Sequence, residues 1–555
     1  MLASCSVKQA AEPPAGEFKT EYLTPVRIVK VSGNVGNAAH LLEPYVGQVS
    51  TDEPDYTSFG KGGSVLLDFG KEIQGGIEVV RTLSGDGALR FRLCLGESVS
   101  EALSNVDDPG CTATNDHSAR DFVITVPWLG SAQYGNSGFR FARLDFIDEG
   151  DVDILAVRAV SKYRDIPYLG SFESSDSRLN EIWRTAAYTV HLNMQEYLWD
   201  GIKRDRLVWM GDLHPEVMTV GTVFGDQEVV RKSLDYVRDK TAPTDWMNGM
   251  ISYSLWWIII HHQWYMWYGD MDYLREQKDY MAALLRSVMS YMDGNRENYP
   301  DSGRFLDWPS NDNPAAIHAG LQAITARALD CGSYLMGELG ENALSRQCKE
   351  VSDALKTYCP DPAGSGQAAA HEAIALMLSP ADASAIILAG GPEKCTSFMG
   401  YYMLEALAMD GRYEEAMKLM SDYWGGMLDL GATTFWEDFN FNDARNAARI
   451  DDIVPEGKFD IHADGGAWCY VGLRHSFCHG WAGGPAPWLS RHVLGIEVLE
   501  PGFKKVRIEP HLGALEWAKG TFPTPYGVIE VSHRRDAGGK VLSDIKVPRG
   551  IKVVK

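Results

Sequence analysis

The sequence predicts a multidomain protein in which a long helical segment lies between two β-rich segments. Apolar and polar residues alternate in short runs within residues 6–168. Apolar residues recur at helical spacing within residues 169–494, and short alternating runs return within residues 495–555. A chain of 555 residues is also too long for one hydrophobic core. We therefore expect a helical domain flanked by two antiparallel β-sandwich domains.

The N-terminal segment has the pattern of an antiparallel β-sandwich. Its short β-prone runs are separated by Gly, Asp and Ser turns, and lie at residues 63–70, 76–81, 89–95, 121–126, 139–146 and 152–158. A sandwich of this kind can bind carbohydrate or support a neighbouring domain. We favour the supporting role.

The middle segment predicts a succession of helices separated by turns that contain Gly, Asp or Pro. The expected helices lie at residues 176–196, 214–239, 251–268, 271–293, 315–337, 341–358, 366–379, 396–409, 412–428 and 465–492. Consecutive helices without strands can form a bundle, a solenoid or a barrel of helix pairs. No repeat of fixed length is present, which disfavours a solenoid.

The C-terminal segment returns to short strands with Pro and Gly turns. These strands are expected at residues 497–499, 505–509, 527–532 and 550–554. A segment of this size predicts a small sandwich that packs on the helical domain in a structural role.

The composition argues against several classes of partner. The chain has 52 basic and 75 acidic residues, a formal charge of −23, whereas nucleic acid and anionic membranes require a basic face. The most apolar run, residues 255–268, contains His261, His262 and Gln263, which predicts a buried helix rather than a membrane span.

The 16 Trp and 24 Tyr residues suit both large aromatic cores and sugar-stacking surfaces. Nine scattered cysteines without a CxxC pair predict free thiols.

The first residues contain a short motif that bears on the location of the protein in the cell. Leu2-Ala-Ser-Cys5 has the form of a bacterial lipobox, although the charged and apolar parts of a signal peptide do not precede it. A chance match of four residues is the alternative. If the motif is real, Cys5 carries lipid and the protein is an exported periplasmic or cell-envelope lipoprotein; otherwise we expect it in the cytoplasm.

The chemistry of the chain is concentrated between residues 200 and 216. This run contains Asp200, Asp205, Asp212 and Glu216 together with three basic residues and Trp209, and its lack of regular period predicts a loop. Loops on rigid scaffolds often hold catalytic groups. Acids beside an indole suit sugar chemistry, in which carboxyl groups move protons and an aromatic face packs on the ring. A surface network of ion pairs is the alternative interpretation.

The run resembles the signature of α-L-rhamnosidases of glycoside hydrolase family 78, which reads Asp-x3-Arg-Asp-Glu-Arg-x2-Trp-x-Gly-Asp. The matching residues are Asp200, Arg204, Asp205, Arg206, Trp209, Gly211 and Asp212. The Glu of the signature, which is the general acid of the family, is missing between Asp205 and Arg206.

Three later stretches are similar to other motifs of the same family. Residues 431–437 resemble the motif that ends in the general base, which assigns that role to Glu437. Residues 477–485 resemble the Cys-His-x-Trp segment and supply His479 and Trp481, although a satisfied His at a helix end is an alternative for His479. Residues 305–309 resemble an active-site loop with Asp307 and Trp308 near the sugar.

The resemblance implies an (α/α)6 barrel and an inverting exo-glycosidase that removes terminal α-L-rhamnose from a glycan or glycoside. It implies that Asp200, Arg204 and Asp212 bind sugar hydroxyls or orient the acid, and that Trp209 and Trp308 cover apolar sugar faces. Trp256 is assigned to a pocket wall, although its helical spacing also suits the core. This mechanism requires neither a metal nor a cofactor. The sequence does not indicate the oligomeric state.

Two alternative functions remain open at this stage. One is a different hydrolase activity on an (α/α)6 barrel, such as uronosyl or glucosyl hydrolysis. The other is a glycan-binding protein that lost catalysis together with the missing Glu.

We assign the role of general acid to Asp205. Asp is shorter than Glu by one C–C bond, roughly 1.5 Å, but the loop is also one residue shorter, and a residue spans up to about 3.3–3.6 Å. The shorter loop can therefore draw the backbone inward. Asp212 and Glu216 are the competing acids. An inverting pair formed by Asp205 and Glu437 would be separated by about 6.5–9.5 Å.

Overall fold

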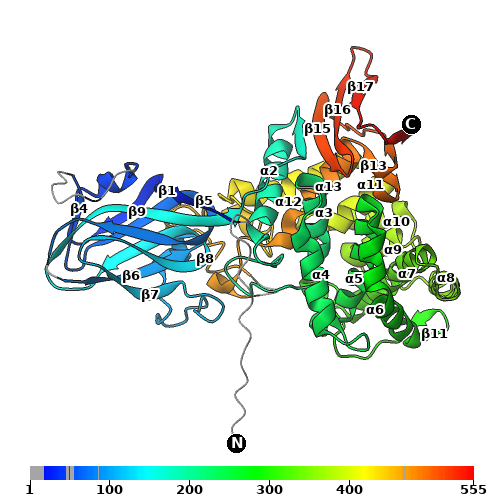
Figure 1. Ribbon diagram of the computed structural model, residues 1–555, viewed down its shortest axis with the longest axis horizontal. Helices are drawn as coiled ribbons and strands as arrows, with labels where there is room; N and C mark the ends of the chain where they lie inside the picture. Colours follow the sequence, from blue (N-terminus) through cyan, green and yellow to red (C-terminus); the bar gives the residue numbers. More distant parts are fainter. Residues whose placement is uncertain (1–17, 46–48, 50–54, 86, 467–469, 555) are drawn as a thin grey trace, which may run out of the picture.

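The computed structural model describes residues 18–45, 49, 55–85, 87–466 and 470–554. An N-terminal sheet domain lies beside a helical body, and the C-terminal sheets pack on one end of that body (Figure 1). The predicted order of β, α and β segments is therefore confirmed. The Leu2–Cys5 motif lies outside the described residues, so the assignment of Cys5 stays a prediction.

The N-terminal sheet domain is organised by two long antiparallel strands, β5 (Ser64–Arg81) and β8 (Gly130–Phe146). The expected runs 63–70 and 76–81 form the single strand β5. A register shift between Asp68 and Ile73 divides it into two halves, which pair with β2 and with β9. The remaining elements are β1 (Phe18–Leu23), β2 (Arg27–Ser32), β3 (Val35–Gly36), β4 (Thr57–Gly60), β6 (Leu89–Gly96), α1 (Val99–Leu103), β7 (Asp121–Val126) and β9 (Asp151–Arg164).

The helical body follows the apolar spacing of the middle segment. Its elements are α2 (Ser177–Asn193), α3 (Leu213–Val223), α4 (Glu228–Lys240), α5 (Ile251–Tyr268), α6 (Met271–Ser290), α7 (Pro314–Glu338), α8 (Asn342–Leu355), α9 (Gly366–Ile374), α10 (Pro380–Gly390), α11 (Gly400–Met409), α12 (Tyr413–Asp429) and α13 (Pro485–Trp488). Among the described residues, α3, α5, α7, α9, α11 and α13 contact one another in a closed ring. Helices α2, α6, α8, α10 and α12 pack against members of this ring.

Two of the expected helices differ from the structure. The run 214–239 is divided into α3 and α4, because Gly225 has a φ of +77° and ends the first helix. The prediction of a helix over 465–492 is wrong, since only its last part is helical. Gly466 and Gly472 have positive φ values of 80° and 63°, and backbone N–H groups of this segment bond to other parts of the chain instead of to a helix. Helix α10 also has no counterpart among the expected helices.

Helix α5 forms the centre of the largest core. Most of its side chains are buried around the whole circumference, as expected for an inner helix. No helix in the described part of the chain combines the length and the apolar character that crossing a bilayer requires. The seven cysteines in that part are free thiols, and five of them are buried.

The C-terminal sheets recruit a strand from before the helices. Strand β10 (Ser171–Ser174) pairs with β15 (Trp517–Thr524), which continues into β16 (Gly527–Arg535) and β17 (Val541–Lys546). A second sheet contains β13 (Ile496–Glu500), β14 (Lys505–Ile508) and β18 (Lys552–Val554), and β14 runs parallel to β18. The expectation of a wholly antiparallel C-terminal domain is therefore wrong.

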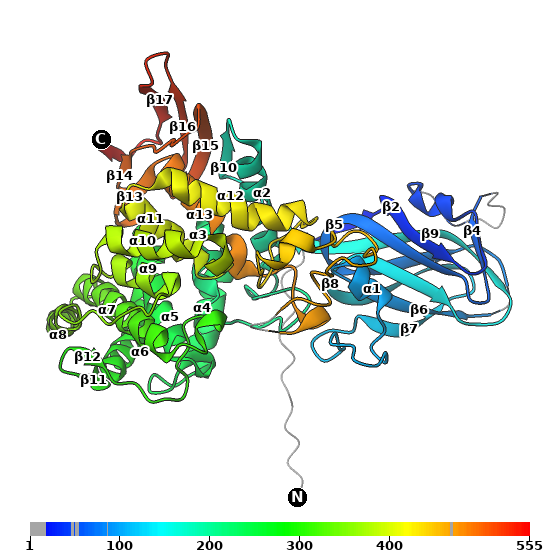
Figure 2. The same ribbon diagram turned by 180° about the vertical axis from the view of Figure 1, so that it is seen from behind.

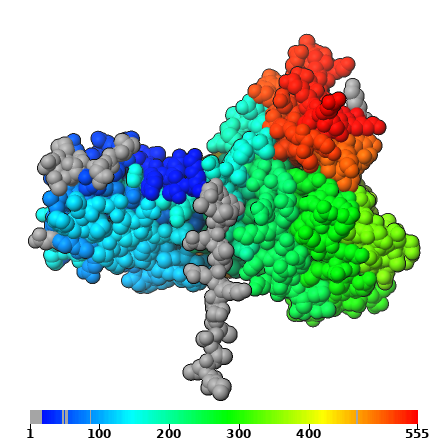
Figure 3. Space-filling model, viewed as in Figure 1, coloured from blue at the N-terminus to red at the C-terminus, as the bar shows by residue number. Residues whose placement is uncertain are grey.

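Irregular loops from the helical body join it to the N-terminal sheet domain. The loops that follow α12, yellow and orange in Figure 2, lie beside the ends of β5 and β8. Arg140 of β8 donates to the carbonyl of Gly431, and the N–H of Glu72 donates to Thr433. The space-filling view shows the N-terminal sheet domain beside the first part of the helical body (Figure 3).

Candidate active site

The candidate active site forms where the loop 200–212 meets the segments 435–438 and 475–481. The N–H of Gly480 donates to the carbonyl of Asp200 at 2.7 Å, and Gly201 pairs with His479 in an isolated β-bridge. Within the loop, Asp205 and Arg206 have φ values of 54° and 57°. Such left-handed conformations are unfavourable for residues other than glycine and cluster at functional sites.

A single guanidinium group joins the two predicted catalytic carboxyl groups. Arg204 donates to both oxygens of Glu437 at 2.6 Å and to Oδ1 of Asp205 at 2.8 Å. Arg204 is 4% exposed and Glu437 is 3% exposed. The fold therefore brings Asp205 and Glu437 to the same guanidinium group, and their roles as a catalytic pair stay predictions.

The surroundings of Glu437 keep its side chain ionised. Burial alone would raise the pKa of this carboxyl, but Arg204, together with His479 and His475, holds the pKa well below its usual range. The N–H of Ser476 also donates to Oε2 at 3.3 Å. Trp481 fixes the backbone here, since its indole N–H donates to the carbonyl of Glu437 at 2.9 Å.

Two further carboxyl groups of the loop lie around His479. Its Nε2 atom is 3.8 Å from an oxygen of Asp200 and 3.8 Å from an oxygen of Asp212. Burial and mutual repulsion raise the pKa of Asp200 well above its ordinary value. Burial also raises the pKa of Asp212 well above its ordinary value, although the hydroxyl of Tyr253 donates to it at 2.7 Å. The raised pKa values favour the protonated forms of these two groups, and a protonated carboxyl group can donate a hydrogen bond as well as accept one.

Asp205 lies between polar partners at the edge of the cluster. The indole N–H of Trp209 donates to Oδ2 at 3.1 Å, and Nδ1 of His117 is 3.3 Å from Oδ1. His117 belongs to the N-terminal sheet domain, a contribution that the sequence did not reveal. The side chain of Asp205 is 13% exposed, against 3% for Glu437.

The competing acid Glu216 is placed differently. It lies within α3, as expected from its position after Pro215, and is fully buried. Neither of its carboxyl oxygens has a hydrogen-bond partner among the described residues. Burial, with Asp212 and Asp200 nearby, raises the pKa of Glu216 well above its ordinary value, which favours the protonated form of this carboxyl.

Asp307 and Trp308 lie at the start of a short 3-10 turn, Trp308–Ser310. Asp307 accepts hydrogen bonds from the N–H of Trp308 at 2.8 Å and from the hydroxyl of Thr396 at 2.6 Å. Burial raises the pKa of Asp307 to about 7. Burial and the charge of Asp307 raise the pKa of Asp438 to about 7 as well. Sequence reasoning missed Asp438, although it directly follows Glu437.

The predicted tryptophans occupy unequal positions. Trp209 is half-buried and packs edge-on against Tyr253, and Trp308 packs edge-on against Phe305. Trp481 is stacked on Phe398. Trp256 is fully buried in the core, stacked with His214 and Tyr402, so the structure does not bring it to the carboxyl cluster.

The raised pKa of Asp307 predicts how the free energy of unfolding changes with pH. The unfolded carboxyl titrates near 3.8 and the folded one near 7, so the folded state binds more protons within that window. The free energy of unfolding should therefore fall as pH rises from about 4 to about 7, by up to a few kcal/mol. Urea unfolding of Asp307→Asn should show a smaller loss between pH 5 and pH 8 than the wild type. The exposed Asp293→Asn variant should keep the wild-type loss, and an unchanged loss in Asp307→Asn would contradict the assignment.

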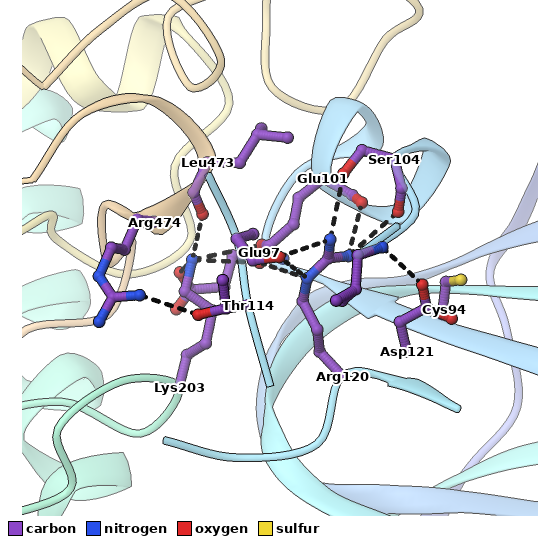
Figure 4. A network of polar contacts seen from close by, with 12 residues as sticks. Cys94, Glu97, Glu101, Ser104, Thr114, Arg120, Asp121, Lys203, Leu473 and Arg474 are labelled. Carbon is purple, nitrogen blue, oxygen red and sulfur yellow. Dashed lines mark hydrogen bonds and ion pairs between the residues drawn. The ribbon is translucent and has the colours of Figure 1, made fainter. Parts of the chain in front are cut away.

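A buried lysine connects the loop to the N-terminal sheet domain (Figure 4). The ammonium group of Lys203 lies 2.9 Å from Glu97 and 3.3 Å from Glu101, and it also donates to the carbonyls of Leu473 and His475. Glu97 and Glu101, with His462, could also hold a cation, since their donor atoms lie within 4.8 Å of one another. The ammonium group of Lys203 supplies positive charge beside Glu97 and Glu101. Its contacts also hold in place the backbone that directly precedes Arg204.

Replacement of Lys203 tests this connection. Lys203→Met leaves Glu97 buried without its cation and leaves Glu101 with Arg120, 3.9 Å away, which should cost about 3–5 kcal/mol of stability. It should also lower any activity of the site, because Arg204 loses its fixed neighbour. Adding Glu97→Gln should restore part of the stability measured by thermal unfolding. The exposed Lys458→Met serves as the control, and equal stability of Lys203→Met and this control would refute the role.

A ring of helices with buried carboxyl groups in its connecting loops suits a six-hairpin glycosidase domain. Residues 167–330 match the family model described as the bacterial alpha-L-rhamnosidase 6 hairpin glycosidase domain. Residues 495–554 match the bacterial alpha-L-rhamnosidase C-terminal domain. The first match includes Asp200–Glu216, whereas Glu437 lies outside both.

Solved structures show the same fold. The family GH78 rhamnosidase of Bacillus sp. GL1 has a TM-score of 0.71 at 20% identity, with 93% of this chain and 55% of that chain covered. The alpha-L-rhamnosidase from Dictyoglumus thermophilum has a TM-score of 0.71 at 18% identity, with 96% and 58% covered. This chain thus spans little more than half the length of these two proteins.

A third solved structure has a similar size to this chain. The rhamnosidase from Klebsiella oxytoca with rhamnose bound has a TM-score of 0.69 at 20% identity, and the alignment covers 85% of this chain and 96% of that chain. No curated protein sequence matches the chain. The predicted resemblance to rhamnosidases of family 78 is confirmed by the domain models and by these structures.

Proposed function

We propose that this protein is a glycoside hydrolase that removes terminal α-L-rhamnose from a glycan or glycoside with inversion of configuration. The observation that carries the proposal is the convergence of Asp205 and Glu437 on Arg204 inside a largely buried cluster of acids, His479 and Trp209. The matches to rhamnosidase domains support the choice of sugar.

In the proposed mechanism, Glu437 is the base and Asp205 is the acid. A base must be ionised before it accepts a proton from water, and Arg204 keeps Glu437 in that state. A carboxylate bonded through both oxygens to a guanidinium group is a weak base, so substrate binding must draw Arg204 from at least one oxygen. Asp205, the more exposed of the two, then protonates the leaving oxygen.

The remaining residues of the cluster are proposed to bind the sugar. Asp200 and Asp212, with raised pKa values and close to His479, can donate to and accept from rhamnose hydroxyls. Trp209 and Trp308 offer apolar faces. The ring of inner helices supports an (α/α)6 barrel as the scaffold. Asp212 lies at the N-cap of α3, and Ser397, just before α11, donates to the carbonyl of Glu437.

One observation favours a second function, the recognition of a glycan without hydrolysis. Arg204 bonds to both carboxyl groups, and the Glu that is the general acid in the family signature is absent. A binding protein would keep this ion-pair arrangement when sugar is bound.

Hydrolysis of an aryl α-L-rhamnoside separates the two functions. We expect release of free rhamnose, and proton NMR of the first product should show the anomer opposite to that of the substrate. Rhamnose-dependent thermal stabilisation without turnover would support the binding function. Turnover of a matched aryl α-glucoside or uronoside, with none of the rhamnoside, would contradict the proposed specificity.

A further inference from the structure

A second cavity lies inside the helical body, separate from the carboxyl cluster. It encloses about 600 Å³, a volume typical of small-molecule sites. Five helices of the inner ring contribute to its wall, and residues of β13 and β14 line it as well. Its buried walls include His214 and Tyr402, whereas Arg507 and Glu509 in the lining have side chains 45% and 61% exposed. The cavity therefore extends from the core toward the C-terminal sheets.

Most charges in the cavity wall neutralise one another. Arg491 donates to Glu405 at 2.8 Å and to Glu497 at 3.1 Å. His492 lies 3.0 Å from the other oxygen of Glu405, and Arg507 also bonds to Glu497. These contacts leave the glutamates of the wall with cationic partners.

Arg327 of α7 differs from these paired charges of the cavity wall. Among the described residues its guanidinium group has no ion pair or hydrogen bond, and its Nη1 atom is buried without a partner. It lies above the ring of Trp256, at 5.7 Å from the centroid. Arg327 is half-buried, and the nearby charge of Glu405, which is already bonded to Arg491 and His492, compensates it less than a bonded anion of its own would. Arg327 is also in the middle of α7, away from the partial charges of the helix ends.

A second polar group of the wall lacks a partner. His214 is 2% exposed, and its Nδ1 atom lies 2.8 Å from the hydroxyl of Tyr402. Its Nε2 atom has no hydrogen-bond partner among the described residues. Arg327 and burial together hold the pKa of His214 well below its ordinary value, so this ring is a neutral donor or acceptor. The wall thus combines an unpaired cation, an unused imidazole nitrogen and tyrosine rings.

We infer that this cavity binds a small oxyanion, a carboxylate or a phosphate, with Arg327 as its cationic partner. A planar guanidinium group binds both kinds of oxyanion through paired N–H donors. The tyrosine rings leave room for an attached sugar-sized body. This site is distinct from the proposed hydrolytic pair, because the lining of the cavity includes neither Asp205 nor Glu437.

The test measures thermal unfolding with D-galacturonate, with inorganic phosphate and with neutral D-galactose. One or both oxyanions should raise the melting temperature of the wild type in a saturable way, and galactose should not. A rise with galacturonate alone identifies a carboxylate site, and a rise with phosphate alone identifies a phosphate site. Arg327→Met should weaken the apparent affinity by at least about tenfold, since a charge-assisted pair contributes about 1.5–3 kcal/mol.

Arg327→Met should also be at least as stable as the wild type without ligand, because it removes a half-buried charge that has no ion pair among the described residues. Arg327→Lys keeps the charge and should retain weakened binding, which provides a second variant if Arg327→Met does not fold. The exposed Arg346→Gln controls for net charge. Equal stabilisation of the wild type and Arg327→Met by the oxyanions, or none of either, would overturn the inference.

Discussion

Replacing Glu437 with Gln should lower hydrolysis of an aryl α-L-rhamnoside by about 10²-fold or more, the usual scale for one acid–base group. The amide keeps the shape of the side chain but cannot accept the proton of the attacking water. It also releases Arg204 from a charged partner that is buried at 3% exposure. The initial rate at saturating substrate is the measurement.

The exposed Glu456 provides the matched control for this experiment. Glu456→Gln should hydrolyse the substrate at the wild-type rate. Circular dichroism and thermal unfolding establish that Glu437→Gln is folded. Near-native turnover by the folded variant would end the assignment of Glu437 as the base.

The second large effect is expected for Asp205→Asn, and it should depend on the leaving group. Substrates with activated aryl leaving groups need little protonation, so they should keep much of their rate. Natural glycosides with poor leaving groups should lose about 10²-fold or more. The comparison of kcat/KM for the two substrate types in the same variant is the decisive measurement.

The same comparison tests the competing acids. Glu216→Gln and Asp212→Asn should reduce both substrate types alike, because these residues are proposed to support the fold and to bind sugar. If one of these variants shows the dependence on leaving group and Asp205→Asn does not, the acid is reassigned to that residue. If no variant shows it and the wild type binds rhamnose without turnover, the binding function is favoured.

The sequence was sufficient for features that depend on local pattern. The period of apolar residues located the sheet regions and nearly all helices, and motif resemblance singled out Asp205 and Glu437, whose catalytic roles stay predictions. It did not locate contacts between distant segments, such as Arg204 with Glu437 or His117 with Asp205. The prediction of a helix over residues 465–492 was wrong for a related reason. Their apolar spacing suits a helix, but the N–H groups bond to distant acceptors such as Glu97.

The sequence also could not predict which charged groups are neighbours in the fold or how their pKa values change. A sequence does not show that Asp438 lies beside Asp307 and has a pKa near 7, because that shift comes from burial and from a neighbour more than a hundred residues away. It also gives no sign that Arg327 has no ion pair within the described part of the chain, whereas Arg491 has two.

The Lys203 contact has a consequence for the order of assembly during synthesis. Glu97 and Glu101 emerge from the ribosome about a hundred residues before Lys203, and the N–H of Phe477 that bonds to Glu97 follows much later. Until then the nascent sheet domain contains Glu97 without its cationic partner, whereas Glu101 lies 3.9 Å from Arg120 of the same domain. The sheet domain can therefore bury Glu97 beside its cation only after the helical body has docked on it. The site cannot form in a chain whose two parts have folded but not docked.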